Sequence, residues 1–151
     1  MALFTGTYEN KVDKKGRVSL PAPFRDRLSG GPERVFYIFP SPTGGGLEAG
    51  DESYMERIAE AIEDQAEVFS VEEDALGQII ADALPVQYDS TGRFVLPRRF
   101  LDHAGIDETA LFVGKAKRFQ IWNPDSYASH ASTARERAKG LTLSLRRRSE
   151  V

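Results

Sequence analysis

Residues 12–25 read Val-Asp-Lys-Lys-Gly-Arg-Val-Ser-Leu-Pro-Ala-Pro-Phe-Arg, and this stretch decides the fold because its pattern occurs twice. The second copy lies at residues 88–101 and repeats Asp-x-x-Gly-Arg-x-x-Leu-Pro-x-x-Phe. Six positions are identical at an interval of 76 residues: Asp13, Gly16, Arg17, Leu20, Pro21 and Phe24 correspond to Asp89, Gly92, Arg93, Leu96, Pro97 and Phe100. Six identities in one short frame indicate an internal duplication.

The first copy predicts a strand, a turn, a second strand and a helical turn. Residues 7–12 alternate as a half-buried strand does, and residues 13–16 have Asp first and Gly fourth, as a turn prefers. Residues 17–20 resume the alternation, with Val18 and Leu20 facing inward. Pro21 is suited to open a short helix that Phe24 would pack against the core.

The rest of the chain is expected to repeat this order with two longer helices inserted between the copies. Buried strands are predicted at 35–39, 111–113 and 119–122, with a weaker one at 47–49. Asp51, Ser70 and Asn123 are the predicted N-caps of helices. We therefore expect a first half at 1–84, a second half at 85–140, and a basic tail at 141–151 whose composition is compatible with disorder.

Composition narrows the class of protein. The 151-residue chain is 40% hydrophobic and 28% charged, which is ordinary for a folded, soluble protein. It has no cysteine, so disulfides, thiolate metal sites and a cysteine nucleophile are excluded. No signal peptide follows Met1 and no apolar run reaches membrane-spanning length, so we expect a cytoplasmic protein without a membrane partner.

The net charge of −3 conceals a strong asymmetry along the chain. Residues 1–34 carry +3 and residues 86–151 carry +5, whereas residues 47–82 hold twelve acids and one arginine. Each copy of the motif therefore opens a basic segment, and an acidic helical stretch separates the two. The local charge thus permits nucleic-acid binding that the overall charge would argue against.

The duplicated motif resembles the MraZ family, within the AbrB-like swapped-hairpin superfamily. The resemblance extends over essentially the whole chain, from Phe4-x-Gly6-x-Tyr8 through both motifs to Leu111–Gly114 and Phe119–Trp122. It implies an α+β fold in which duplicated swapped hairpins form one β-barrel with peripheral helices. It also implies a bacterial, nucleoid-associated DNA-binding regulator that represses the promoter of its own division and cell-wall gene cluster. The implied partners are double-stranded promoter DNA with repeated boxes and further copies of the chain in a ring-like homo-oligomer.

The same resemblance points to the DNA-contacting residues. Lys15 and Arg17 stand at the family's basic motif positions, with Lys14 beside them, and Arg25 matches a basic position of the superfamily. The second copy keeps Arg93, but it has Thr91 in place of Lys15 and Leu101 in place of Arg25. These departures weaken the case for an equal DNA-binding role of the second hairpin.

Each of these residues also has a plainer interpretation. The cations at 14–17 could belong to a solvated turn, and Arg93, Arg98 and Arg99 could balance the acidic segment instead of touching DNA. Arg146–Arg148 fits a solvated tail better than a DNA reader. A different function would be a non-catalytic, antitoxin-type protein-interaction module that uses the acidic helices. No spacing of His, Ser or carboxylate residues suggests a catalytic or metal site, so neither an enzyme nor a cofactor is expected.

Overall fold

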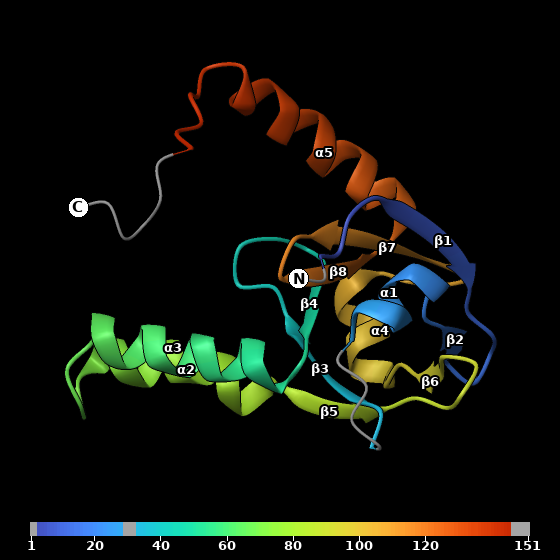
Figure 1. Cartoon of the computed structure of the whole chain (residues 1–151), viewed down its shortest axis with the longest axis horizontal. Coiled ribbons are helices and arrows are strands. Elements are labelled where there is room, and N and C mark those ends of the chain that lie inside the picture. The colour runs from blue at the N-terminus through green and yellow to red at the C-terminus, as the bar shows by residue number, and fades with distance from the viewer. Residues whose placement is uncertain (1–2, 29–32, 146–151) are drawn as a thin grey trace.

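The computed structural model describes residues 3–28 and 33–145, and it has a mixed α+β architecture. The strands lie on one side of the molecule and a long helical hairpin projects from the other (Figure 1). Along the chain the elements are β1 (Thr7–Lys11), β2 (Arg17–Ser19), α1 (Ala22–Arg27), β3 (Val35–Pro40), β4 (Leu47–Gly50), α2 (Glu52–Gln65), α3 (Val71–Asp82), β5 (Leu84–Gln87), β6 (Arg93–Val95), α4 (Arg98–Ala104), β7 (Thr109–Lys115), β8 (Arg118–Trp122) and α5 (Pro124–Ala138).

Six strands form one antiparallel sheet in the order β1-β7-β8-β4-β3-β5. This order is symmetric, because β1, β7 and β8 of one side correspond to β5, β3 and β4 of the other in the duplicated sequence. A pseudo-twofold axis therefore passes between β4 and β8, whose register pairs Glu48 with Gln120. The sheet is continuous only because each half of the chain supplies strands to the other.

The remaining two strands, β2 and β6, pair with each other as a short ribbon. Their register places Val18 opposite Phe94, which are equivalent residues of the two motif copies. The expected closed barrel is therefore wrong: the strands form an open six-stranded sheet and a separate ribbon. A closed barrel would require β2 and β6 to pair with the edge strands of the six-stranded sheet. Each of these two strands has only three residues, and its backbone hydrogen bonds go to the other strand of the ribbon.

The core lies between the ribbon, the short helices and the six-stranded sheet. Phe24 and Phe100, the last residues of the two motifs, are almost completely buried. Phe24 packs edge-on against Phe4 with ring centroids 5.3 Å apart, and Phe36 meets Phe94 in the same way at 5.1 Å. Such edge-to-face aromatic pairs add to the stabilisation from burial alone.

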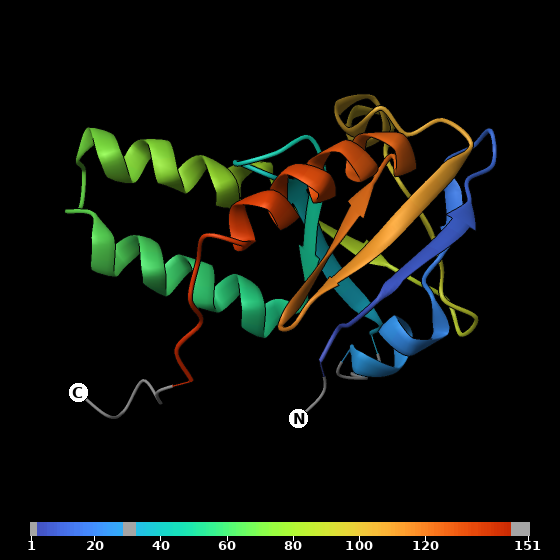
Figure 2. The same cartoon turned by 90° about the horizontal axis from the view of Figure 1, so that it is seen from above.

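The three longer helices begin directly after the N-cap residues that the sequence predicted. The side chains of Asp51, Ser70 and Asn123 each accept a backbone N–H bond in the first turn of α2, α3 and α5. The helices α2 and α3 run side by side away from the sheet (Figure 2), and neither has a buried residue among those described. By contrast, α5 lies over β7 and β8 near its start, where Tyr127 packs against Trp122.

A charged residue lies unexpectedly inside the sheet. Glu48 is 5% exposed and accepts bonds from Arg118 Nε at 2.8 Å and from Gln120 Nε2 at 2.9 Å. Trp122 Nε1 then donates to Gln120 Oε1 at 2.9 Å. This network joins β4 to β8, so the pseudo-twofold seam is held by polar as well as apolar contacts.

Among the described helices, none is long and apolar enough to cross a membrane.

Candidate nucleic-acid interface

The first turn, residues 13–16, is organised by the carboxylate of Asp13. One oxygen, Oδ1, accepts the backbone N–H groups of Lys15 and Arg17, both at 2.9 Å. The other oxygen, Oδ2, accepts Arg17 Nε at 2.6 Å. Gly16 closes the turn with φ of 81°, a left-handed conformation that favours glycine. The single carboxylate thus fixes both the backbone of the turn and the direction of the Arg17 side chain.

The second turn, residues 89–92, repeats this arrangement. Asp89 Oδ1 accepts the backbone N–H groups of Thr91 and Arg93 at 2.9 Å, and it also accepts the Thr91 hydroxyl at 2.8 Å. Arg93 Nε lies 3.5 Å from Asp89 Oδ2, a looser ion pair than that of the first turn. Both motif arginines are therefore aimed by the aspartate four residues earlier.

These hydrogen bonds keep both aspartates ionised. The pKa of Asp89 is lowered to about 2, first by the Arg93 backbone N–H and then by the Thr91 hydroxyl. The pKa of Asp13 is also lowered, first by the Arg17 backbone N–H and then by the Arg17 side chain. Each turn therefore holds a full negative charge against its arginine at neutral pH.

The ribbon brings the two motif arginines onto one outer face. Arg17 lies opposite Val95 and Arg93 lies opposite Ser19, while the residues between them, Val18 and Phe94, point into the core. Arg17 and Arg93 are thus diagonal neighbours, for which a Cα separation of roughly 7–8 Å is typical. Because β2 and β6 are antiparallel and each follows its turn, the two turns lie at opposite ends of this ribbon.

The basic side chains around the ribbon differ in the contacts that they make with other residues. The side chains of Lys14 and Lys15 are exposed and bond to no other described residue. On α4, Arg98 lies 3.9 Å from Asp102, and the guanidinium of Arg99 stacks over the Phe100 ring at 4.2 Å. Neither α4 arginine pairs with the acidic segment within the described residues. Arg146–Arg148 lie outside the described residues.

Arg25 reaches the second turn from α1. Its Nη1 donates to the carbonyl oxygen of Thr91 at 2.6 Å, and its side chain covers Gly92. The equivalent residue in the second copy, Leu101, is buried and covers Gly16 of the first turn. Each short helix therefore supports the turn of the opposite half, with an arginine in one case and a leucine in the other.

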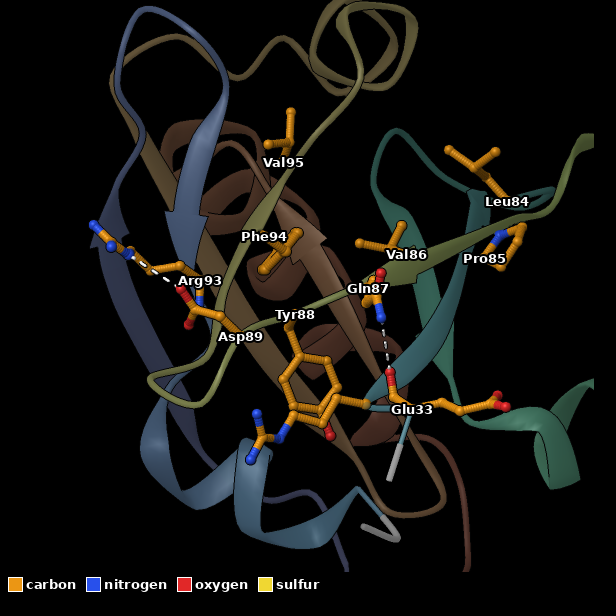
Figure 3. A pocket seen from close by; sticks show the side chains of 11 residues that line it. Glu33, Leu84, Pro85, Val86, Gln87, Tyr88, Asp89, Arg93, Phe94 and Val95 are labelled. Atoms are coloured by element: carbon orange, nitrogen blue, oxygen red, sulfur yellow. Dashed lines mark hydrogen bonds and ion pairs between the residues drawn. The ribbon is translucent and has the colours of Figure 1, made fainter. Parts of the chain in front are cut away.

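A groove of about 610 Å³ opens between β5 and β6, beside the second turn. Figure 3 shows Val86 and Phe94 within it, while Arg93 extends outward to Asp89. In the first half, Asn10 Nδ2 donates to the Ser19 carbonyl at 2.6 Å and ties β1 to β2. The equivalent of Asn10 is Val86, which has no side-chain donor, so this tie is absent from the second half.

Sequence reasoning placed the turns and the outward arginines but missed what supports them. The available signal was the position of Asn10 in the alternation, because it shares the inward face of the strand with Val12 and a polar side chain on that face needs a partner. The support of each turn from the opposite half also left no local pattern, since the contacting residues are 66 or more positions apart.

Comparison with known proteins places the chain in a family. A family model described as "MraZ protein, putative antitoxin-like" matches residues 3–40 and 79–144. A protein of Rhodospirillum rubrum named transcriptional regulator MraZ is 41% identical over 82% of this chain and 81% of its own length. Proteins of the same name from Pelagibacter ubique and Rickettsia canadensis are 37% and 38% identical, over 90% and 97% of this chain and 88% and 98% of their own lengths. Because the family model and these relatives span most of the sequence, the chain belongs to the MraZ family.

Proposed function

We propose that the protein is a transcriptional regulator that binds double-stranded promoter DNA through the outer face of the β2–β6 ribbon and its turns. The observation that carries this proposal is the convergence of Arg17 and Arg93 on one exposed face, each directed by its own aspartate. A guanidinium held in this way loses little conformational freedom on binding. The relatives' name, transcriptional regulator, supports the same conclusion.

The ribbon offers two kinds of contact to DNA. Lys14 and Lys15 are free of described partners and suit phosphates, where they would set affinity and its salt dependence. Arg17 uses Nε for Asp13, so its terminal Nη groups remain to donate to O6 and N7 of a guanine in the major groove. Arg93 sits in a looser pair at the second turn, and we assign it a supporting contact.

Arg25 is given a different role in this proposal. Its guanidinium already donates to the Thr91 carbonyl at 2.6 Å, and it packs against Gly92. We therefore infer that it orients the second turn for Arg93, and that its remaining donors contribute less to DNA than those of Arg17.

We extend the proposal to assembly and target. A ribbon with a few cations binds weakly alone, so a ring-like homo-oligomer would present several ribbons to repeated boxes. The promoter of the protein's own division and cell-wall gene cluster is the proposed site, with repression by occupancy at the nucleoid. We also assign the fold to the swapped-hairpin type, since β1 and β2 take their strand partners from the second half. In this arrangement the halves 1–84 and 85–140 are each incomplete alone.

The test is a titration of the chain's own upstream DNA across a salt series, comparing the wild type with Arg17→Ala. Losing the guanidinium should weaken binding by about 10- to 100-fold per ribbon. Arg57→Ala is the matched control, because Arg57 is an exposed arginine on α2 and its loss changes the net charge equally.

Three outcomes separate the alternatives. A selective loss with Arg17→Ala supports the ribbon as the DNA-binding surface. An equal loss with both variants would reduce the effect to net charge and contradict the proposed site. Absence of binding by the wild type would favour a protein-interaction module that uses the acidic helices.

A further inference from the structure

A cavity of about 360 Å³ lies beside the start of α2, where separate parts of the chain meet. Among the residues that the structure describes, three basic side chains line it: Arg27 from the end of α1, Arg57 from the second turn of α2, and Lys117 from the turn between β7 and β8. Phe4, which is buried against Phe24, supplies the apolar part of the lining. The fold thus brings positive charges that are far apart in sequence to the wall of one small cavity.

These cations gather here although the neighbouring sequence offers many carboxylates. Residues 52–82 contain ten acids and one arginine, Arg57, yet Arg57 forms no ion pair with any described residue. Arg27 also has no ion pair within the described chain, since its Nε donates to the Leu3 carbonyl at 2.8 Å and its Nη1 to the Pro23 carbonyl at 3.3 Å. Because like charges repel, an anion placed among these side chains would lower their electrostatic energy.

The rest of the lining supplies hydroxyl groups and one carboxylate. The Asp51 carboxylate caps α2 by accepting the Tyr54 backbone N–H at 2.9 Å, so the cavity has three cations against one engaged anion. Ser53 adds an exposed hydroxyl. The pKa of Tyr54 is raised, chiefly by burial, so its hydroxyl keeps its proton and remains a donor. Cations combined with neutral donors suit the oxygens of a phosphate group.

We propose that this cavity binds the phosphate group of a small ligand through Arg27, Arg57 and Lys117. An arginine can offer two parallel N–H groups to phosphate oxygens, and a lysine adds a compact positive charge. The volume is near the lower end of the range of about 300–1,000 Å³ for small-molecule sites, which favours a phosphate ester with few atoms over a dinucleotide. The lining includes no residue of the β2–β6 ribbon, so this proposal does not depend on DNA binding.

The first experiment is calorimetric titration of the full-length chain with sodium pyrophosphate, with the ionic strength held constant by sodium chloride. The wild type should give a saturable binding curve. Arg57→Gln/Lys117→Gln should weaken binding by about 10- to 100-fold, because each change removes a charge-assisted hydrogen bond. Both side chains are exposed, so the fold should survive the change, and the thermal unfolding midpoint checks this. A wild type whose heats do not saturate would overturn the proposal.

A second variant tests the cavity while it keeps every cation. Ser53→Asp places a carboxylate at an exposed position of the lining, in the first turn of α2, where an acidic side chain is compatible with the helix. It should weaken pyrophosphate binding by about tenfold or more, because the added charge repels the ligand. Pyrophosphate binding that is unchanged in both this variant and Arg57→Gln/Lys117→Gln would contradict the site.

The matched control is Arg135→Gln/Arg137→Gln on α5. It makes the same change in net charge at exposed positions that do not line the cavity. Its affinity for pyrophosphate should equal that of the wild type. A loss as large as that of Arg57→Gln/Lys117→Gln would reduce the effect to net charge and overturn the proposal.

The DNA backbone is another source of phosphate, and a salt series distinguishes the two. Arg57→Gln/Lys117→Gln should leave the salt slope of DNA binding unchanged. A slope smaller by about two, without pyrophosphate binding by the wild type, would assign these cations to DNA and contradict the small-ligand site. Arg17→Ala should bind pyrophosphate as the wild type does, so this site and the proposed DNA-binding surface fail independently.

Discussion

Two glycines show how closely the turns and strands approach each other in this fold. Gly16 has φ of 81°, and a Cβ built there would lie 2.6 Å from the carbonyl oxygen of Leu96. Gly46 has no positive φ, but a Cβ there would lie 2.6 Å from the Trp122 indole. The glycines around 44–46 therefore serve close packing under Trp122. At both positions a side chain is excluded by a residue that is distant in sequence, so the local sequence does not reveal the reason.

Gly16→Ala should destabilise the fold by roughly 1–3 kcal/mol or more, because it combines a disfavoured backbone conformation with a backbone clash. Gly77→Ala is the matched control. Gly77 lies within α3 with nothing within 4 Å of a built Cβ, so alanine there should stabilise the helix by about 0.5–1 kcal/mol. Urea unfolding of both variants measures the two effects. Equal changes in the free energy of unfolding would contradict a special cost at Gly16 from its backbone conformation and its contact with Leu96.

At the scale of elements, the sequence predicted most strands and helices but not their partners. Alternation and capping residues located β1, β2, α2, α3 and α5 to within a few residues. Strand β1 pairs with β7 and β2 pairs with β6 across 74 to 106 positions, from Ser19 with Arg93 to Thr7 with Val113, so no local pattern could reveal these pairings. A turn such as residues 13–16 ordinarily joins two paired strands, yet here β1 pairs with β7 and β2 pairs with β6.

The burial of Glu48 is a feature that the charge pattern of the sequence could not predict. Glu48 belongs to the acidic segment by sequence, but it lies inside the sheet because Arg118 and Gln120 satisfy its carboxylate. The pairing residues are 70 and 72 positions away, so their availability could not be anticipated. By contrast, Arg17 is exposed as the strand alternation predicted, and Lys14, Lys15 and Arg93 are exposed as well. Whether they contact DNA stays a prediction.

The link between α1 and the second turn gives a prediction of its own. Arg25→Leu copies the arrangement of the other half, where Leu101 covers the first turn. It removes the bond to the Thr91 carbonyl, so stability should fall by about 1 kcal/mol for a partly exposed, charged donor. The salt slope of DNA binding should stay unchanged, because the guanidinium is already engaged. A slope smaller by about one would instead mean that Arg25 contacts a phosphate.

At the scale of the whole molecule, the layout separates two surfaces. The β2–β6 ribbon with its basic turns and the acidic α2–α3 hairpin lie at opposite ends of the molecule (Figures 1 and 2). An acidic end beside DNA would be repelled by phosphates, whereas the hairpin extends away from the ribbon. This separation lets a chain with net charge −3 present a cationic face to DNA. Under the proposed function, binding strength should depend on how many copies act together.

The last prediction follows from that dependence. DNA with two boxes one helical turn apart, about 10 base pairs, should bind the wild type about 100-fold more tightly than DNA with one box. Shifting one box by about 5 base pairs should remove this gain, because the second ribbon then faces the wrong side of the duplex. If the shifted box keeps the full gain, the ribbons are not held in a fixed register along the duplex, and the proposed assembly is contradicted.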